Sequence, residues 1–287
     1  MYAARTSRCN LTASILTINW VLTKMTIPNL QNTEALRARA RALRMNGLLE
    51  HWSEVDGADW IEPLLQWEED ERAHRSLQRR MRDAKLGHFK TFADFEWAWP
   101  KRIDRGAVEE LMSLSFLADA TNVVFTGPNG VGKSTLAKNL ANQALVAGHT
   151  VLFRSASEML GELAALDSDS ALRRRLHYYA AADILLVDEV GYLSYTNRHA
   201  DLLFELISRR YEARSTIVTT NKAFADWSEV FPNAACVVSL VDRLVHRAEV
   251  ISIEGESYRL KEARERTEAR VRQRGAKKSV PRKEDGV

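Results

Sequence analysis

The sequence has few cysteines and no long hydrophobic run, and these absences exclude several classes of protein. Only two cysteines occur in 287 residues, and neither Cys9 nor Cys236 stands in a C-x-x-C pair or near a histidine at metal-site spacing. We therefore expect neither a disulfide framework nor a structural zinc site, and we predict a cytoplasmic location. No segment approaches the roughly 18 apolar residues that cross a membrane, so we expect a soluble protein without a membrane partner.

The beginning of the chain lacks a complete targeting signal. Arg5 and Arg8 precede a mildly apolar run, but Thr, Ser and Asn interrupt this run, and no small-x-small cleavage site follows it. We predict that residues 1–32 are a disordered leader, or an upstream extension of a chain that could equally begin at Met25.

A strong net charge is also missing, because 41 basic residues nearly balance 38 acidic residues. The arginines are instead clustered in residues 34–44 and from Tyr258 onward. Such clusters are candidate surfaces for phosphate groups, although a solvated helix face is the commoner explanation for any one of them.

The first third of the chain has the three- and four-residue spacing of apolar positions that is typical of helices. It predicts a small all-helical domain over residues 33–90, with a break near Gly47. Residues 91–106 are predicted to be a linker. Five aromatic residues lie between residues 87 and 106, and we expect them to pack onto the next domain rather than to bind a ligand.

From residue 107 onward, short β-rich runs alternate with segments of helical length. The predicted strands are 122–127, 150–155, 183–189, 215–221 and 249–254. This order predicts an α/β domain over residues 107–261, with a parallel sheet and helices on both of its faces. Residues 262–287 are charged and lack apolar periodicity, so we predict a disordered tail there.

A glycine-rich stretch between a predicted strand and a predicted helix matches the phosphate-binding pattern G-x-x-x-x-G-K-[ST]. Its residues are Gly127, Pro128, Asn129, Gly130, Val131, Gly132, Lys133, Ser134 and Thr135. The glycines allow backbone N–H groups to converge on phosphate oxygens, and the following helix directs its positive end at the same anion. We expect Lys133 to bridge the outer phosphates and Ser134 to offer its hydroxyl to Mg²⁺.

Two adjacent carboxylates end the apolar run ILLV at residues 184–187. In open α/β sheets, ligands bind at the carboxyl ends of such buried strands. Asp188 suits Mg²⁺ coordination, either directly or through water, and Glu189 suits polarising the water that attacks a γ-phosphate. The pair therefore predicts hydrolysis, and the alternative is an acid pair that caps a helix.

Polar residues also end the following strand, where Thr219, Thr220 and Asn221 are expected near the same sheet edge. Asn221 is predicted to form a hydrogen bond with the γ-phosphate or the attacking water. A turn residue at the end of a strand is the alternative.

Arg243 and Arg247 are spaced one helical turn apart further along the chain. They are poorly placed for the nucleotide of their own subunit but could reach that of a neighbour, and an arginine supplied in this way accelerates phosphoryl transfer. A surface pair of Asp242 with Arg243 is the alternative, and Arg209 and Arg210 compete for the same role.

The order of these motifs resembles that of the IstB-like ATP-binding proteins of bacterial insertion sequences, which are AAA+ ATPases related to the DnaC helicase loaders. The likeness covers residues 33–262, and VDEVGYL (187–193) with EGESYRL (254–260) is more specific than the phosphate loop alone. It implies an AAA+ P-loop core behind a helical domain, ATPase activity with ATP and Mg²⁺, and a homo-oligomer on double-stranded DNA with little sequence preference. It also implies, as a partner, a transposase encoded by the same element. A DnaC-like replicative helicase loader is the alternative.

The resemblance also implies roles for individual residues. The catalytic set would be Lys133, Asp188, Glu189, Asn221 and, acting across the subunit boundary, Arg243. Ser134 and Asp188 would hold the metal ion. The chain after residue 254 is too short and too charged for a full helical lid, so Arg259 is the one nearby candidate for a second sensor arginine.

Overall fold

The computed structural model describes residues 30–192, 195–232 and 234–278. The chain divides into two compact units, with the boundary between Ser76 and Leu77. Our prediction placed the end of the helical domain at residue 90. The difference arises because the last turns of helix α5 (Ile61–Ala84) belong to the second unit, where Leu77 and Ala84 join a hydrophobic core.

The first unit is helical. It contains α2 (Leu30–Ala42), α3 (Asn46–Glu50), α4 (Trp52–Val55) and the first part of α5. Its core consists of Ala40, Leu43, Trp52, Ile61 and Leu65. The guanidinium of Arg39 donates two hydrogen bonds of 2.8 Å to the carboxylate of Glu69, which ties α2 to α5. Cys9 and the predicted leader lie outside the described residues, apart from the residues that begin α2.

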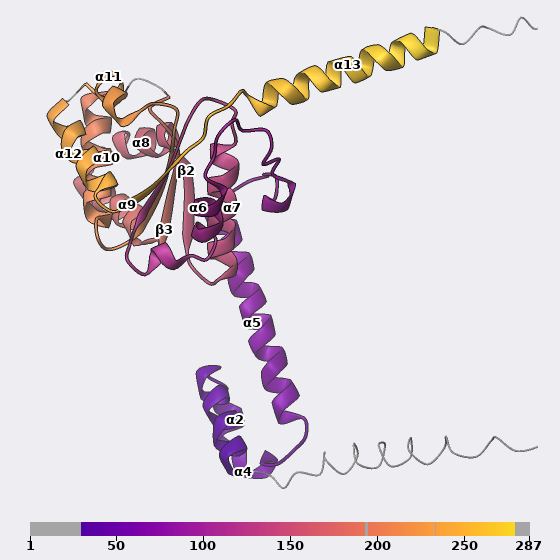
Figure 1. Cartoon of the computed structure of the whole chain (residues 1–287). Helices are drawn as coiled ribbons and strands as arrows, with labels where there is room; N and C mark the ends of the chain where they lie inside the picture. Colours follow the sequence, from indigo (N-terminus) through magenta and orange to yellow (C-terminus); the bar gives the residue numbers. More distant parts are fainter. Residues whose placement is uncertain (1–29, 193–194, 233, 279–287) are drawn as a thin grey trace, which may run out of the picture. The chain divides into compact units, whose positions relative to one another are not determined.

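The second unit contains a five-stranded parallel sheet in the order β2-β3-β4-β1-β5. Figure 1 labels β2 and β3 of this sheet. The strands are β1 (Asn122–Thr126), β2 (Val151–Ser155), β3 (Ile184–Val190), β4 (Ser215–Thr220) and β5 (Ala248–Ser252). Each strand begins and ends within two residues of a predicted run. The predicted α/β class with a parallel sheet is confirmed.

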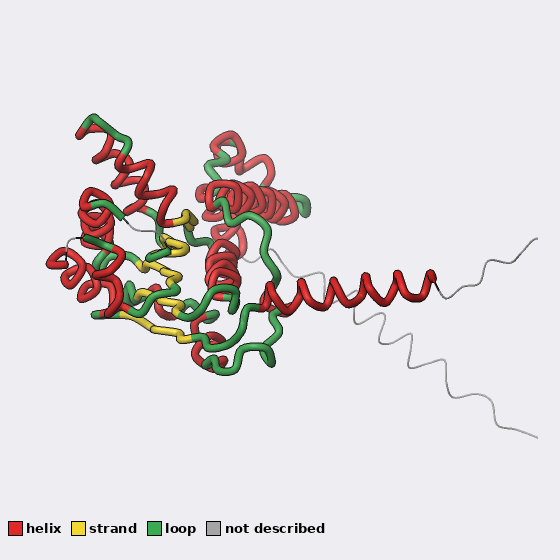
Figure 2. The backbone as a smooth tube through the Cα atoms, turned by 90° about the horizontal axis from the view of Figure 1, so that it is seen from above, coloured by secondary structure: helices red, strands yellow, loops and turns green. Residues whose placement is uncertain are grey.

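Helices lie on both faces of this sheet (Figure 2). They are α6 (Arg105–Leu111), α7 (Lys133–Val146), α8 (Ala156–Ala164), α9 (Asp169–Ala181), α10 (Asn197–Arg210), α11 (Trp227–Val230) and α12 (Ala234–Val245). A further helix, α13 (Tyr258–Lys278), follows β5, and none of its described side chains belongs to the two cores beside the sheet. Three short 3-10 helices accompany them: η1 (Phe92–Asp94), η2 (Ser115–Leu117) and η3 (Phe224–Asp226). In the described part of the chain, no helix is long and apolar enough to cross a membrane.

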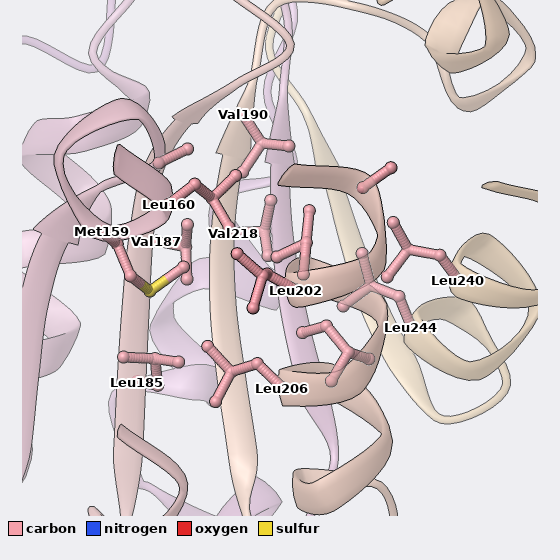
Figure 3. Close-up of a cluster of buried hydrophobic side chains, with 14 of the residues drawn as sticks. Met159, Leu160, Leu185, Val187, Val190, Leu202, Leu206, Val218, Leu240 and Leu244 are labelled. Carbon is pink, nitrogen blue, oxygen red and sulfur yellow. The ribbon is translucent and has the colours of Figure 1, made fainter. Parts of the chain in front are cut away.

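The sheet is buried on both faces, which explains why its central strands are continuously apolar. On β3, Leu185 and Val187 belong to the core that is shared with α8, α9, α10 and α12, whereas Ile184 and Leu186 belong to the core that is shared with α6 and α7. Figure 3 shows the first of these cores, where Leu202 of α10 lies against the strands. Side-chain alternation along each strand therefore feeds two separate cores.

The structure differs from the predicted disordered tail over residues 262–278, because α13 continues to Lys278. Leu260 and Val271 on this helix are 60% and 62% exposed, so burial of an apolar face does not hold it. Pairs four residues apart stabilise it instead, with N–O distances of 3.7 Å for Glu262 with Arg266 and 3.9 Å for Glu268 with Arg272. The prediction relied on apolar periodicity and did not weigh this charge spacing.

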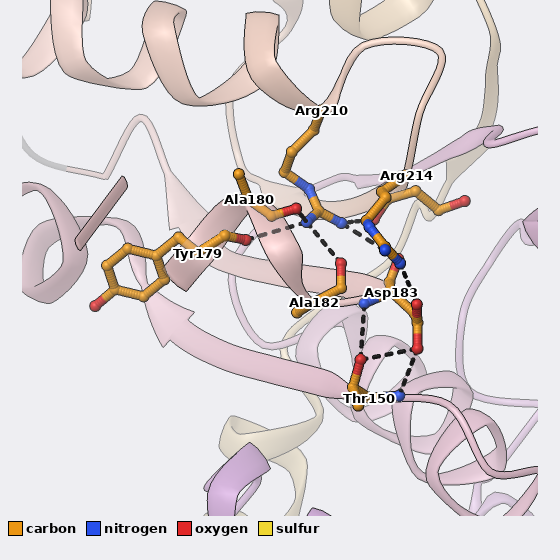
Figure 4. A network of polar contacts seen from close by, with 8 residues as sticks. Thr150, Tyr179, Ala180, Ala182, Asp183, Arg210 and Arg214 are labelled. Carbon is orange, nitrogen blue, oxygen red and sulfur yellow. Dashed lines mark hydrogen bonds and ion pairs between the residues drawn. The ribbon is translucent and has the colours of Figure 1, made fainter. Parts of the chain in front are cut away.

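One buried arginine joins several chain segments at the end of the sheet away from the phosphate loop (Figure 4). Arg210 is 1% exposed, and its Nε donates to the Thr216 hydroxyl at 3.1 Å. Its other two nitrogens donate to the backbone carbonyls of Tyr179, Ala180, Ala182, Asp183 and Ser215. Burial lowers the pKa of Arg210 to about 9, which leaves it charged at neutral pH. This guanidinium fastens the end of α9 to the starts of β3 and β4.

We predict that Arg210→Ala lowers the free energy of unfolding by about 3 kcal/mol or more, because several buried carbonyl groups lose their donor. Arg209→Ala is a matched control, since the adjacent Arg209 pairs with Glu205 at the surface and its loss should change stability by less than about 1 kcal/mol. Urea unfolding followed by circular dichroism measures both. Equal effects of the two substitutions would contradict the structural role of Arg210.

Candidate nucleotide-binding and hydrolysis site

The phosphate loop connects the carboxyl end of β1 to the first residue of α7, as the sequence predicts. Residues 129–135 of this loop and helix line a cavity of about 500 Å³, which is within the usual size range of small-molecule sites. At Gly127, where φ is 146°, an added Cβ would lie 2.1 Å from the carbonyl oxygen of Ile253. At Gly132, where φ is 104°, it would lie 2.7 Å from the ring of Phe95. The glycines are therefore required both by backbone conformation and by close neighbours.

Lys133 lies within the loop that it is predicted to serve. Its Nζ donates to the carbonyl oxygens of Gly127 and Pro128, each at 2.7 Å. Burial lowers the pKa of Lys133, and the nearby carboxylates of Asp188 and Glu189 partly oppose this effect. A poorly solvated ammonium in this position gains more from an incoming phosphate than an exposed lysine would.

Ser134 and Asp188 meet across the sheet edge. The hydroxyl of Ser134 donates to Oδ1 of Asp188 at 2.7 Å, and Asp188 is 8% exposed. A hydroxyl and a carboxylate are hard oxygen ligands of the kind that Mg²⁺ prefers, so these two residues fit the ion. Among the described residues, no group of three or more His, Cys, Asp or Glu side chains is arranged so that it could hold a metal ion. Two protein oxygens with the rest of the shell from phosphates and water is the usual arrangement for Mg²⁺.

Glu189 and Asn221 line the same cavity from the ends of β3 and β4. Glu189 is exposed to the cavity, while Oδ1 of Asn221 is buried and has no hydrogen-bond partner. A buried acceptor without a donor is costly, and a water molecule or a nucleotide group could supply the missing hydrogen bond. The structure thus brings together Lys133, Ser134, Asp188, Glu189 and Asn221.

Arg243 is placed differently. It does not line the cavity among the described residues, and its guanidinium lies 4.6 Å from the ring centre of Phe204 and donates to the hydroxyl of Ser208. Arg247 pairs with Glu212 at 3.8 Å, also away from the cavity. Arg243 therefore cannot serve its own nucleotide in this conformation.

The other candidate arginines differ in their surroundings. Arg210 is fully engaged by backbone carbonyls, so it is unsuitable as an arginine that reaches a neighbouring subunit. Arg209 pairs with Glu205 on its own helix. Arg259 lines the cavity, and its charge contributes to the lowered pKa of Lys133. The expectation that Arg259 lies near the nucleotide site agrees with this position.

One wall of the cavity was not predicted from the sequence, and we call it the rim. The rim consists of residues from the aromatic linker and from the first turns of α13: Lys90, Glu96, Trp99, Tyr258 and Glu262. Ion pairs with N–O distances of 2.5 Å join Lys90 to Glu262, and Lys261 to Glu96. The indole N–H of Trp99 donates to the carbonyl of Glu256 at 2.9 Å, and the ammonium of Lys261 lies 4.5 Å from the ring centre of Trp99.

The linker aromatics only partly follow our prediction. Phe92, Phe95 and Trp97 do pack against the core that contains α7. Trp99 instead lines the cavity together with residues of the phosphate loop. The high density of aromatic residues before Pro100 was the available sign that this segment packs against another part of the protein. The sequence alone did not show that this part is the segment after β5.

We predict that Trp99→Ala weakens ATP binding about tenfold, because it removes an aromatic wall of the cavity that a nucleotide base could stack on. Trp67→Ala is the control, since Trp67 is 68% exposed on the other unit. Equilibrium titration with a fluorescent ATP analogue measures both. An unchanged dissociation constant in Trp99→Ala would show that the rim does not contact the nucleotide.

The chain is similar in sequence to known proteins. The family model described as IstB-like ATP binding protein matches residues 33–266. A protein named for ATP binding in insertion sequence IS21 of Pseudomonas aeruginosa is 39% identical over 211 residues, covering 74% of this chain and 80% of that protein. Its counterpart in insertion sequence IS5376 of Geobacillus stearothermophilus is 30% identical over 240 residues, covering 80% and 96%.

A solved structure is also similar, at lower identity. The crystal structure of DnaI has a TM-score of 0.48 and 20% identity, covering 57% of this chain and 90% of that one. The family match extends over both the helical unit and the sheet domain, and it includes every residue placed in the site above. This chain belongs to the family of IstB-like ATP-binding proteins.

Proposed function

We propose that this protein is an ATPase that assembles on double-stranded DNA and directs a transposase of the same insertion sequence to its target. The hydrogen bond between Ser134 and Asp188, with Glu189 exposed beside it in the cavity, is the observation that carries the proposal. A site that only binds a nucleotide needs the phosphate loop. A second carboxylate in the cavity adds the means to activate water.

In the proposed reaction, the loop N–H groups and the ammonium of Lys133 bind the phosphate oxygens of ATP. When bound, Mg²⁺ on Ser134 and Asp188 would offset the negative charge of the phosphates. Glu189 accepts a proton from the attacking water, and the buried oxygen of Asn221 accepts a second hydrogen bond from that water and orients it. Water replaces ADP on the γ-phosphorus, so the products are ADP and inorganic phosphate.

The proposal of assembly rests on the position of Arg243. A transferring phosphoryl group develops charge that a supplied arginine stabilises, and the cavity of one subunit has no contribution from its own Arg243. An arginine from a neighbouring copy would complete the site. ATP would then lie between two copies and favour their association, because it binds the assembled form more tightly than the separate chains.

The arginine-rich segments support DNA as a partner, and the names of the relatives support a transposase. Assembly would align arginine-rich segments such as α13 along a duplex, where contacts to the phosphate backbone give affinity with little sequence preference. The relatives are named for insertion sequences, which supports a transposase rather than a replicative helicase as the protein partner.

We predict that Glu189→Gln traps an ATP-bound assembly on DNA, because the amide fills the same space but cannot accept the proton of the attacking water. ATP turnover should fall at least 100-fold, while DNA binding in the presence of ATP becomes tighter and longer-lived. Glu158→Gln changes an exposed acid in the first turn of α8 and should leave both properties unchanged. A Glu189→Gln protein that binds DNA equally with and without ATP, in filter binding or gel shift, would contradict the proposal.

We also predict that Arg243→Ala retains ATP binding but loses turnover by about 1,000-fold, since an arginine supplied in trans contributes about 10³ or more to the rate. Mixing Arg243→Ala with Lys133→Ala should restore partial turnover, because one kind of mixed interface has both an intact cavity and an intact arginine. Arg82→Ala is the control, since Arg82 is an exposed residue of α5 that pairs with Asp83. Normal turnover by Arg243→Ala, or no recovery on mixing, would exclude Arg243 from the shared site.

A further inference from the structure

Asp188 and Glu189 are neighbours on β3, yet Asp188 contacts Ser134, which lines the cavity, and Glu189 lines the same cavity directly. Successive side chains of a regular strand point to opposite faces of a sheet, so two adjacent carboxylates should not converge. Here Asp188 meets Ser134 of the phosphate loop helix, and Glu189 lines the cavity. Some local departure from regular strand geometry must bring them together.

The pairing of β3 with β4 shows where this departure lies. Val187 is opposite Val218, and the next paired residues are Val190 and Thr220. Between these pairs, β3 advances by three residues and β4 by two, so β3 contains one extra residue at this point. This is a β-bulge, and such bulges redirect side chains near functional sites. Glu189 takes the unusual conformation, with a φ of 61°, which residues with a side chain rarely adopt.

The bulge is held by one side chain from the neighbouring strand. Thr219 lies on β4 between the paired residues and is 0% exposed. Its hydroxyl donates to Oδ1 of Asp188 at 2.5 Å and accepts the backbone N–H of Glu189 at 2.9 Å. The hydroxyl thus supplies an acceptor for Glu189 at the point where the regular pairing is interrupted, and it fixes the adjacent carboxylate at the same time.

We propose that Thr219 is a positioning residue for ATP hydrolysis, and that its hydroxyl holds the bulge that turns Asp188 and Glu189 toward one nucleotide. This inference rests on the proposed function, which assigns the metal ion to Asp188 and the attacking water to Glu189. The neighbouring Thr220 has a different task, since its hydroxyl accepts the N–H of Lys222 at 3.1 Å in the turn after β4. The two threonines are therefore not interchangeable.

The chemistry of the side chain defines the test. Valine has nearly the same shape as threonine but can neither donate to Asp188 nor accept from Glu189, whereas serine can do both. Ser215 provides a matched control on the same strand, because its hydroxyl is also buried but has no hydrogen-bond partner. Ser215→Ala therefore removes a buried hydroxyl of β4 that does not contact either carboxylate.

The experiment measures ATP turnover and the dissociation constant of a non-hydrolysable ATP analogue for Thr219→Val, Thr219→Ser and Ser215→Ala. We expect kcat to fall at least 30-fold in Thr219→Val with nucleotide affinity within about threefold of the parent, and Thr219→Ser to recover most of the rate. On a Glu189→Gln background, Thr219→Val should add less than about threefold, because both changes act on the same step. Loss of affinity equal to loss of rate, or full additivity with Glu189→Gln, would overturn the inference.

Crystal structures of Thr219→Val and Thr219→Ser give a readout that does not depend on turnover. In Thr219→Val we expect Glu189 to leave the positive-φ conformation or to turn its carboxylate out of the cavity, and in Thr219→Ser we expect both to be retained. An unchanged Glu189 in Thr219→Val would refute the role of Thr219. Absence of turnover in the parent protein would instead refute the proposed ATPase function, and the two structures would still decide whether Thr219 places Glu189.

Discussion

The contact between Ser134 and Asp188 depends on a property of parallel sheets. All strands of such a sheet run in the same direction, so their carboxyl ends, and whatever follows them, gather at one edge. β1 delivers the phosphate loop to this edge, β3 delivers the two carboxylates, and β4 delivers Asn221. The rest of the second unit keeps these strands in register, through two hydrophobic cores on opposite faces and through Arg210 at the far ends of β3 and β4.

Sequence patterns predicted the parts of the fold that are encoded locally. The strands are continuously apolar because both of their faces are buried, and that pattern remains readable in a single sequence. The phosphate loop combines glycines, a lysine and a serine at fixed spacing, so its place between a strand and a helix was predictable. Asn221 was expected near the two carboxylates because it follows a predicted parallel strand, and the carboxyl ends of such strands lie together.

The missed features depend on contacts between residues far apart in the sequence. Lys261 and Glu96 form an ion pair across 165 positions, and no local pattern predicts that meeting. Arg210 could not be distinguished from the exposed Arg209 beside it, because arginine is expected at the surface and only the carbonyls around Arg210 explain its burial. Thr219 was placed near the site, but its link to both carboxylates depends on a bulge that the regular two-residue period of a strand does not reveal.

The rim has a consequence for the choice of boundaries in a shortened protein. Its residues come from before the first strand and after the last one, so the cavity wall reaches from Lys90 to Glu262. A fragment trimmed to the sheet and its covering helices would keep the glycine loop and most residues of the two cores, although it would lose Ala84 and Leu86 from the core beside α7. Its ATP cavity would nevertheless lack the wall that the rim forms. The shortest fragment with a complete cavity is therefore longer than the shortest fragment with a complete sheet.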